Sequence, residues 1–160
     1  MKVITTATFI AALFIFNAVI YILGEQRKVE FPGVCHYELS HLRKSDKGLL
    51  NINAAYTLLK KADKKGEILV EGQVVVEGTS LSYHMNRIMS FNITQENDNG
   101  LYFLEFYSVN RKSDDNTPDS LFSLMHANLT TQTLLKVEKV KDNAYLLTTQ
   151  LTPLPICISG

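Results

Sequence analysis

The stretch Ser80–Thr94, SLSYHMNRIMSFNIT, alternates apolar and polar side chains over almost its whole length. Alternation with a period of two places the apolar side chains on one face of a strand and the polar ones on the other. The apolar positions are Leu81, Tyr83, Met85, Met89, Phe91 and Ile93. A strand of this length with one buried face is typical of an antiparallel sheet, so the stretch predicts a mainly β fold.

The same period recurs on both sides of this stretch. Turn-forming residues separate the alternating segments, as in Glu77-Gly78-Thr79, Asn97–Gly100 and Lys141-Asp142-Asn143. Asn, Asp and Gly adopt the backbone conformations that tight hairpins require. We therefore predict about seven strands, within residues 34–41, 50–58, 66–78, 80–94, 101–109, 133–140 and 144–151.

One short helix interrupts the series of strands. Thr117 is a residue type that caps helices, Pro118 fits a first turn, and Asp119 favours the positive end of the helix. Long strands joined by hairpins favour a curled meander. The predicted fold is therefore an antiparallel β-sandwich or partly closed β-barrel with one short helix, which buries Leu121, Phe122, Leu124 and Met125.

The segment Val3–Leu23 contains no charged residue. As a helix it would be about 31 Å long, close to the thickness of the hydrocarbon core of a bilayer. A cleaved signal peptide is the alternative, but its apolar region is usually shorter and ends at a small-residue cleavage site. We expect a cytoplasmic start and transmembrane anchor in residues 1–24, a connector in 25–33, and an antiparallel β-domain in 34–160.

Charge and motif content predict a protein that is not an enzyme. The 16 Lys and Arg residues balance the 16 Asp and Glu residues of this 160-residue chain, so no basic excess favours nucleic acid. The four histidines have no metal-ligand spacing, and no nucleotide-binding or nucleophile motif is present. We expect no catalytic residue, no cofactor and no metal site.

The chain has only two cysteines, Cys35 and Cys157, one near each end of the polar part. We predict that they form a disulfide, although two buried free thiols are the alternative. A disulfide persists in an oxidising compartment, which favours a β-domain outside the cytoplasm. Pro153 and Pro155 cannot donate ladder hydrogen bonds, so we expect that regular pairing alone does not hold the end of the chain.

Arg87 is the one charged residue on the apolar face of Ser80–Thr94, between Met85 and Met89. A β-bulge near Asn86 and Arg87 would turn its side chain outward. The alternative is an inward Arg87 in a structural ion pair with a carboxylate such as Glu105 on the next strand.

Several motifs occur together in a recognisable order: an amino-terminal anchor, a cysteine soon after it, RIMSF, TPDSL, KDNAYLL and a PLPIC ending. In this arrangement the chain resembles the FidL-like membrane proteins of enteric bacteria. The resemblance implies a single-pass inner-membrane protein with a periplasmic domain and no enzyme activity. It also implies an accessory role beside a membrane-anchored, ToxR-like transcription regulator, as ToxS has beside ToxR. A periplasmic module that binds an apolar small molecule in the mouth of the curled sheet is the alternative function.

Overall fold

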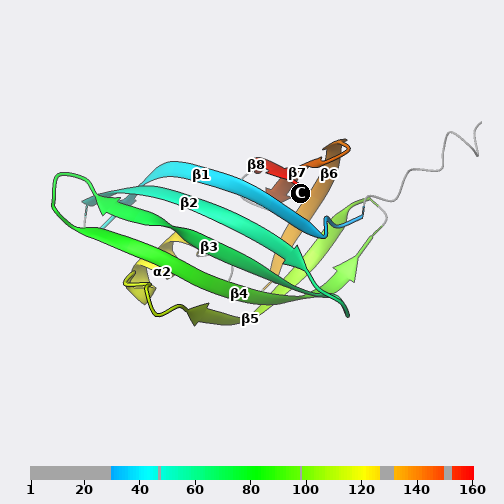
Figure 1. Cartoon of the computed structure of the whole chain (residues 1–160), viewed down its shortest axis with the longest axis horizontal. Helices are drawn as coiled ribbons and strands as arrows, with labels where there is room; N and C mark the ends of the chain where they lie inside the picture. The colour runs from blue at the N-terminus through cyan, green and yellow to red at the C-terminus, as the bar shows by residue number, and fades with distance from the viewer. Residues whose placement is uncertain (1–29, 47, 98, 127–131, 150–152) are drawn as a thin grey trace, which may run out of the picture.

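Eight antiparallel strands, each paired with the next along the chain, form a closed barrel in the computed structural model (Figure 1). The structure describes residues 30–46, 48–97, 99–126, 132–149 and 153–160. The strands are β1 Val34–Ser45, β2 Gly48–Lys60, β3 Lys65–Val76, β4 Ser82–Glu96, β5 Leu101–Arg111, β6 Gln132–Lys141, β7 Ala144–Thr149 and β8 Pro153–Ile158. The helix α2, Asp119–Met125, lies between β5 and β6 in the chain.

This architecture confirms a mainly β fold with one short helix, and it selects the barrel over the sandwich. Within the described residues, no helix is long and apolar enough to cross a bilayer. The predicted transmembrane segment Val3–Leu23 lies outside the described residues.

The alternating apolar and polar residues of the sequence face the inside and the outside of the barrel, respectively. From Leu50 to Leu58 of β2 every second residue is buried, whereas the residues between them are exposed or half-buried. Phe31, in the predicted connector, also belongs to the core, with its ring 4.9 Å from that of Tyr102 and 6.3 Å from that of Phe91. The β-domain core therefore includes a residue that precedes β1.

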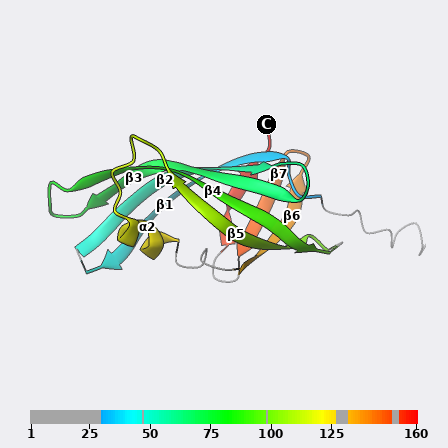
Figure 2. The same ribbon diagram turned by 90° about the horizontal axis from the view of Figure 1, so that it is seen from below.

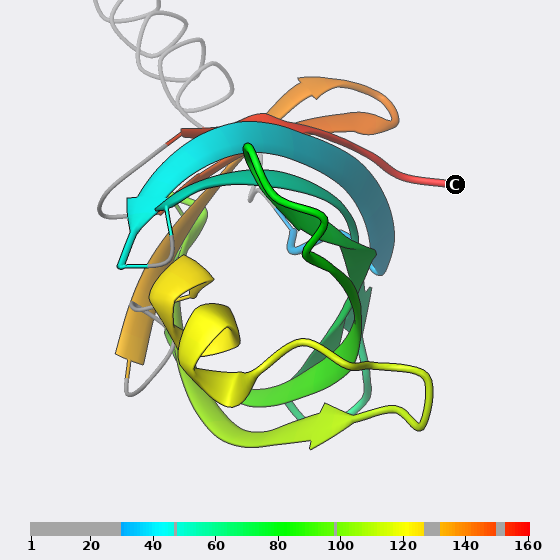
Figure 3. The same ribbon diagram turned by 90° about the vertical axis from the view of Figure 1, so that its left-hand side faces the viewer.

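The two ends of the barrel differ in what covers them. Figure 2 shows α2 and the β6–β7 pair at opposite ends, and Figure 3 shows α2 inside the ring of strands. Leu121 of α2 packs on a small apolar cluster formed by Leu50, Ile52, Val74 and Val76. The helix therefore covers the mouth formed by the beginning of β2 and the end of β3.

The strand ranges predicted from the sequence did not include Pro153–Ile158, which forms β8. β8 pairs with β7 through register partners that include Tyr145 with Cys157 and Thr148 with Pro153. With β1, β8 has a single described register pair, His36 with Ile158. The prolines are tolerated because β8 is short and has little pairing on its β1 side.

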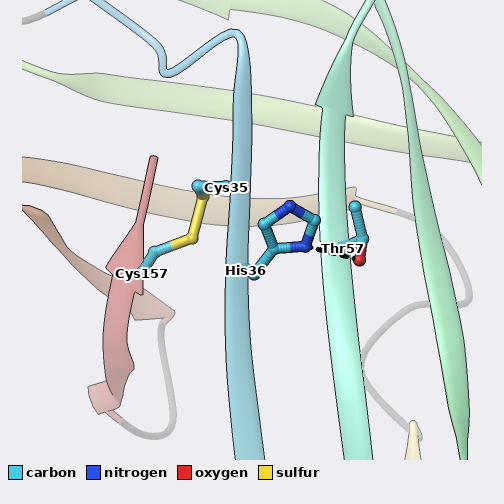
Figure 4. Close-up of a disulfide and its surroundings, with 4 residues drawn as sticks. All are labelled: Cys35, His36, Thr57 and Cys157. Carbon is cyan, nitrogen blue, oxygen red and sulfur yellow. Dashed lines mark hydrogen bonds between the residues drawn. A yellow bond between two sulfur atoms is a disulfide. The ribbon is translucent and has the colours of Figure 1, made fainter. Parts of the chain in front are cut away.

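The disulfide between Cys35 and Cys157 lies beside this single pair (Figure 4). It joins Cα atoms that are 5.5 Å apart and residues that are 122 positions apart in the chain. Both cysteines are fully buried. The predicted disulfide is therefore present, and it reinforces the place where β1 and β8 close the barrel.

We expect Cys157→Ser to lower the free energy of unfolding by about 2–5 kcal/mol, the usual cost of losing a native disulfide from a small domain. Cys35→Ser should cost about the same, because each change removes the same bond. Urea denaturation followed by circular dichroism measures both. The double variant should be scarcely less stable than either single variant; additive losses would contradict a shared bond.

Candidate functional site

Arg87 lies inside the barrel, with only 4% of its surface exposed. The register between β3 and β4 runs without a shift from Glu71 opposite Asn86 to Val70 opposite Arg87. The bulge predicted at this place is therefore wrong. The register shifts of β4 occur in its pairing with β5, at Ser90 and Phe91 and again after Ile93.

The guanidinium of Arg87 binds the chain that follows β5. Its Nε donates to Asp115 Oδ2 at 2.9 Å, and its Nη1 donates to Asp119 Oδ1 at 2.7 Å. Its Nη2 donates to the carbonyl oxygen of Thr117 at 2.6 Å. The guanidinium carbon also lies 4.3 Å from the ring centroid of Phe122, a cation–π distance.

The predicted partner of Arg87, Glu105, does not pair with it. Glu105 is exposed, and it lies opposite Asn92 on β4 and Gln132 on β6. The interpretation of an inward arginine is confirmed, but its partners come from the loop and helix after β5 and not from the strand itself. The choice of Glu105 was wrong because it assumed that the partner of Arg87 lies on β5 itself.

Asp115 is the buried partner in this ion pair, with a side chain that is 0% exposed. Burial raises the pKa of its carboxyl, but hydrogen bonds from Arg87 and from the backbone N–H groups of Asn86 and Thr117 outweigh this effect. The net pKa lies below the ordinary value. Asp115 is therefore ionised at neutral pH and satisfied on both carboxylate oxygens.

A second arginine supports the same loop from the surface. Nη2 of Arg111 donates to the Thr117 carbonyl oxygen at 2.7 Å and to Asp119 Oδ1 at 2.8 Å. The hydrogen bond from Arg87, and then the charges of both arginines, lower the pKa of the Asp119 carboxyl. We call Arg87, Arg111, Asp115, Thr117 and Asp119 the Arg87 cluster.

The loop between β5 and α2 also pairs with β4 through its backbone. The Asn116 N–H donates to the His84 carbonyl oxygen at 3.0 Å, and the His84 N–H donates to Asn116 Oδ1 at 2.7 Å. The Lys112 N–H donates to the Asn86 carbonyl oxygen at 3.0 Å. The loop therefore continues along the edge of β4 beyond the last residue of β5.

Thr117 does not cap α2 as the sequence predicted. The N-cap residue is Pro118, and no side chain forms a capping hydrogen bond. The Thr117 hydroxyl instead donates to the His84 carbonyl oxygen at 2.9 Å. The start of α2 is therefore positioned by contacts with β4 and with the two arginines.

The end of α2 is held by His126. Its Nδ1 lies 3.1 Å from the Phe122 carbonyl oxygen and its Nε2 lies 3.1 Å from Tyr56 Oη. Because the carbonyl can only accept, Nδ1 carries the proton and the Tyr56 hydroxyl donates to Nε2. Burial lowers the pKa of His126 to about 4 and raises the pKa of Tyr56 to about 12. Both groups are therefore neutral at neutral pH.

An open groove lies on the outer face of the barrel beside the loop that carries Asn116. Its volume is about 580 Å³. The lining comes from β2, β3, β4 and the loop: Asn53, Ala55, Glu71, Gly72, Gln73, Ser82, His84 and Asn116. These side chains offer amide, hydroxyl, carboxylate and imidazole groups, so the groove suits a hydrogen-bonding partner better than an apolar ligand.

Metal chemistry has no candidate centre in the part of the chain that the structure describes, because no group of three or more His, Cys, Asp and Glu side chains could hold an ion there.

Sequence reasoning found Arg87 but missed Asp115, Asp119 and His126. The run DDNTPD, residues 114–119, follows β5 directly and was a usable signal. An arginine on the apolar face of a strand needs a carboxylate partner. This run contains three aspartates, and it follows the strand next to the one that carries Arg87.

Comparison with known proteins identifies one family. The model of the family described as "FidL-like putative membrane protein" matches residues 72–157, which is more than half of the chain. The match runs from the groove-lining Gly72 to Cys157 and contains the whole Arg87 cluster. No curated protein matches the chain.

We expect Arg87→Met to destabilise the barrel by about 3–5 kcal/mol, because the buried Asp115 carboxylate loses its cation. The matched control is Arg111→Met, whose side chain is 43% exposed; it pairs with the exposed Asp119 at 2.8 Å and only at 3.7 Å with Asp115, which keeps Arg87 as its closer cation. This control should cost at most about 1 kcal/mol. Urea denaturation of both variants at pH 7 measures the difference, and equal losses would show that burial of the pair is unimportant.

Acid should destabilise the protein through His126. Its pKa is lowered from 6.5 to about 4 by burial, so below pH 6.5 the unfolded chain binds a proton that the folded chain does not. The free energy of unfolding should therefore fall as the pH is lowered from about 6.5 to about 4. Denaturation at stepped pH values measures this slope. His126→Gln should reduce it, and an unchanged slope in that variant would assign the effect to other groups.

Proposed function

Because the chain belongs to the FidL-like family of membrane proteins, we propose that it is a non-enzymatic accessory protein of the inner membrane. In this proposal residues 3–23 cross the bilayer once and the β-domain lies in the periplasm. The disulfide supports the periplasmic placement, since such bonds persist in oxidising compartments and are rare in the cytosol.

The partner that we propose is the periplasmic domain of a membrane-anchored regulator of the ToxR-like class. The observation that carries an interaction role is the packing of the described interior. Eighteen buried residues form its main core cluster, and among them Phe91, Met85, Met89 and Leu104 are no more than 2% exposed. This packing of the described interior favours action through the outer surface.

The same observation weighs against the alternative of an apolar-ligand module. A ligand barrel keeps a lined cavity of several hundred Å³ in its interior. The groove of about 580 Å³ instead lies on the outer face, where Asn53, Glu71, Gln73 and His84 supply polar groups. We propose this groove as the contact surface for the partner domain.

The groove has features that suit contact with a folded protein. Ser82 and Gln73 are already joined by a hydrogen bond of 2.8 Å, and Asn116 is bound to His84. Side chains that are held in place before binding lose less conformational entropy when a partner arrives. The Arg87 cluster fixes the loop that forms one wall of the groove, so the buried ion pair supports the proposed contact surface without touching the partner.

Site-specific crosslinking in intact membranes tests this function. A photo-crosslinking residue placed at Gln73 should capture a membrane-anchored protein with a periplasmic domain, identified by mass spectrometry. The matched control is the same residue at Lys139, which is exposed on β6 and is not a groove residue. Equal capture from the two positions, or adducts that contain only cytoplasmic proteins, would contradict the proposal.

The orientation is controlled in the same strain. A reporter that is active only in the periplasm, fused after Gly160, should be active, whereas a reporter that works only in the cytoplasm should be silent. The reverse pattern would overturn the periplasmic placement whatever the crosslinking result.

A further inference from the structure

Four lysines lie within the six residues that join β2 to β3. The segment reads KKADKK, residues 60–65, and its four lysines and one aspartate give it a net charge of +3. All six residues are exposed. Because the chain as a whole carries no net charge, this segment is a local concentration of positive charge. We call it the lysine turn.

Two of the four lysines are already paired with carboxylates of the neighbouring strands. Lys61 pairs with Glu67, and the Nζ atom of Lys64 lies 3.5 Å from Glu96 Oε1. The other two lysines form no ion pair with a described carboxylate. Exposed ion pairs are weak, so the lysine turn offers at least two ammonium groups to an anionic partner.

The backbone of the lysine turn is held in an unusual conformation. Asp63 has φ of 59° and Lys64 has φ of 57°, in the left-handed region that favours Gly, Asn and Asp. The Ile93 N–H donates to the Lys64 carbonyl oxygen at 2.6 Å, and the Lys61 N–H donates to the Lys65 carbonyl oxygen at 2.8 Å. A lysine thus occupies a position where glycine would be less strained, which indicates a use for its charge.

The chain enters the barrel beside the lysine turn. The Lys60 N–H donates to the Gly33 carbonyl oxygen at 2.7 Å. The ring of Phe31 lies 6.3 Å from that of Phe91, and Phe91 is the register partner of Gly66, which directly follows the lysine turn. Two independent contacts therefore hold the entry of the chain next to this turn.

The entry of the chain and α2 lie at opposite ends of the barrel. The antiparallel order places the start of β1 and the lysine turn at one end, and the end of β3 at the other. In Figure 1 the arrowhead of β2, which leads into the lysine turn, lies at the end opposite α2. Because β3 has 12 residues, the two ends are about 40 Å apart along a strand.

We propose that the lysine turn binds anionic phospholipid headgroups of the membrane that the chain's own anchor crosses. This inference rests on the proposed function, in which residues 3–23 cross the bilayer. Residue 30 is seven positions beyond residue 23, and a chain of that length spans at most about 25 Å. The tether therefore keeps the lysine turn within reach of the bilayer surface, whereas the α2 end lies farther away.

The charge of the turn suits this occupant. Anionic headgroups attract lysine side chains that come within about one Debye length of the surface, which is ~10 Å at 0.1 M salt. An ammonium on a flexible four-carbon stem can follow a headgroup phosphate. Because the anchor already holds the barrel at the membrane, a weak attraction is sufficient to orient it. An acidic protein surface would offer similar charge, but no tether brings it to this turn.

The proposed contact also sets the direction of the outer groove. Ser82 is the first residue of β4, and Asn116 lies in the loop that leads into α2. Both line the groove, and both lie toward the α2 end. With the lysine turn on the bilayer surface, this part of the groove points away from the membrane. A partner domain can then reach it without displacing lipid.

Energy transfer from a dye on the protein to acceptor dyes on lipid headgroups tests the contact in the full chain. The native cysteines are bonded to each other, so Ala62→Cys provides a single thiol in the lysine turn. The rate of transfer should rise severalfold when phosphatidylglycerol is added to phosphatidylcholine vesicles. The matched control is Ser80→Cys, an exposed residue beyond the other end of β3. Its transfer should be severalfold slower and should not respond to phosphatidylglycerol.

Charge variants of the Ala62→Cys protein identify the groups responsible. Lys60→Gln combined with Lys65→Gln should abolish the rise with phosphatidylglycerol. Lys44→Gln combined with Lys112→Gln removes the same charge from exposed positions at the α2 end, and this control should keep the rise. Salt at about 1 M, where the Debye length is ~3 Å, should also abolish the rise.

Three results would overturn the inference: transfer that does not depend on phosphatidylglycerol, equal transfer from the two dye positions, or equal loss in the two lysine double variants. The first is also the result expected if the turn binds an acidic protein instead. Flotation of the chain with the vesicles after an alkaline wash reports on the anchor separately. A chain that floats without a lipid-dependent signal overturns this inference alone, whereas a chain that does not float contradicts the proposed function as well.

Discussion

A guanidinium inside a barrel must be paired, and this requirement determines how the chain between β5 and β6 is arranged. Arg87 lies on the inner face of β4 and is 4% exposed. An unpaired charge there would cost several kcal/mol. Asp115, the Thr117 carbonyl and Asp119 supply the pairing, and all three come from one loop and the helix start that it leads to. The ion pair therefore fixes the loop, the loop positions α2, and α2 covers the mouth of the barrel.

The other half of the barrel depends on a covalent constraint. β8 is short and contains two prolines, and its described pairing with β1 is a single register pair. The Cys35–Cys157 bond lies at that pair and joins the first strand to the last. A polar network thus stabilises the end of the barrel that holds α2, whereas a disulfide stabilises the contact between the first and the last strand. The polar network also holds the loop that forms one wall of the outer groove, through the hydrogen bond from Thr117 to His84, whereas the disulfide is not among the groove-lining residues.

The sequence predicted the elements better than their partners. Strict alternation in Ser80–Thr94 and in β2 fixed the strands, because one buried face requires that period. The disulfide followed from there being only two cysteines. Glu105 was wrongly paired with Arg87 because side-chain partners across a loop depend on where the loop folds back, which periodicity does not encode. β8 was missed because its prolines break the strand pattern, and its pairing depends on β7 and on the bond at Cys157.

The order of strands around the barrel has a consequence for how the chain folds. Each strand from β1 to β8 pairs with its neighbour in sequence, so most pairings close short loops at low entropic cost. The single exception joins β1 to β8, across 122 residues. On a chain made from its amino end, β1 exists long before its closing partner. The contact between β1 and β8 is thus the last strand pairing to form, and oxidation of the two thiols marks the completion of the barrel.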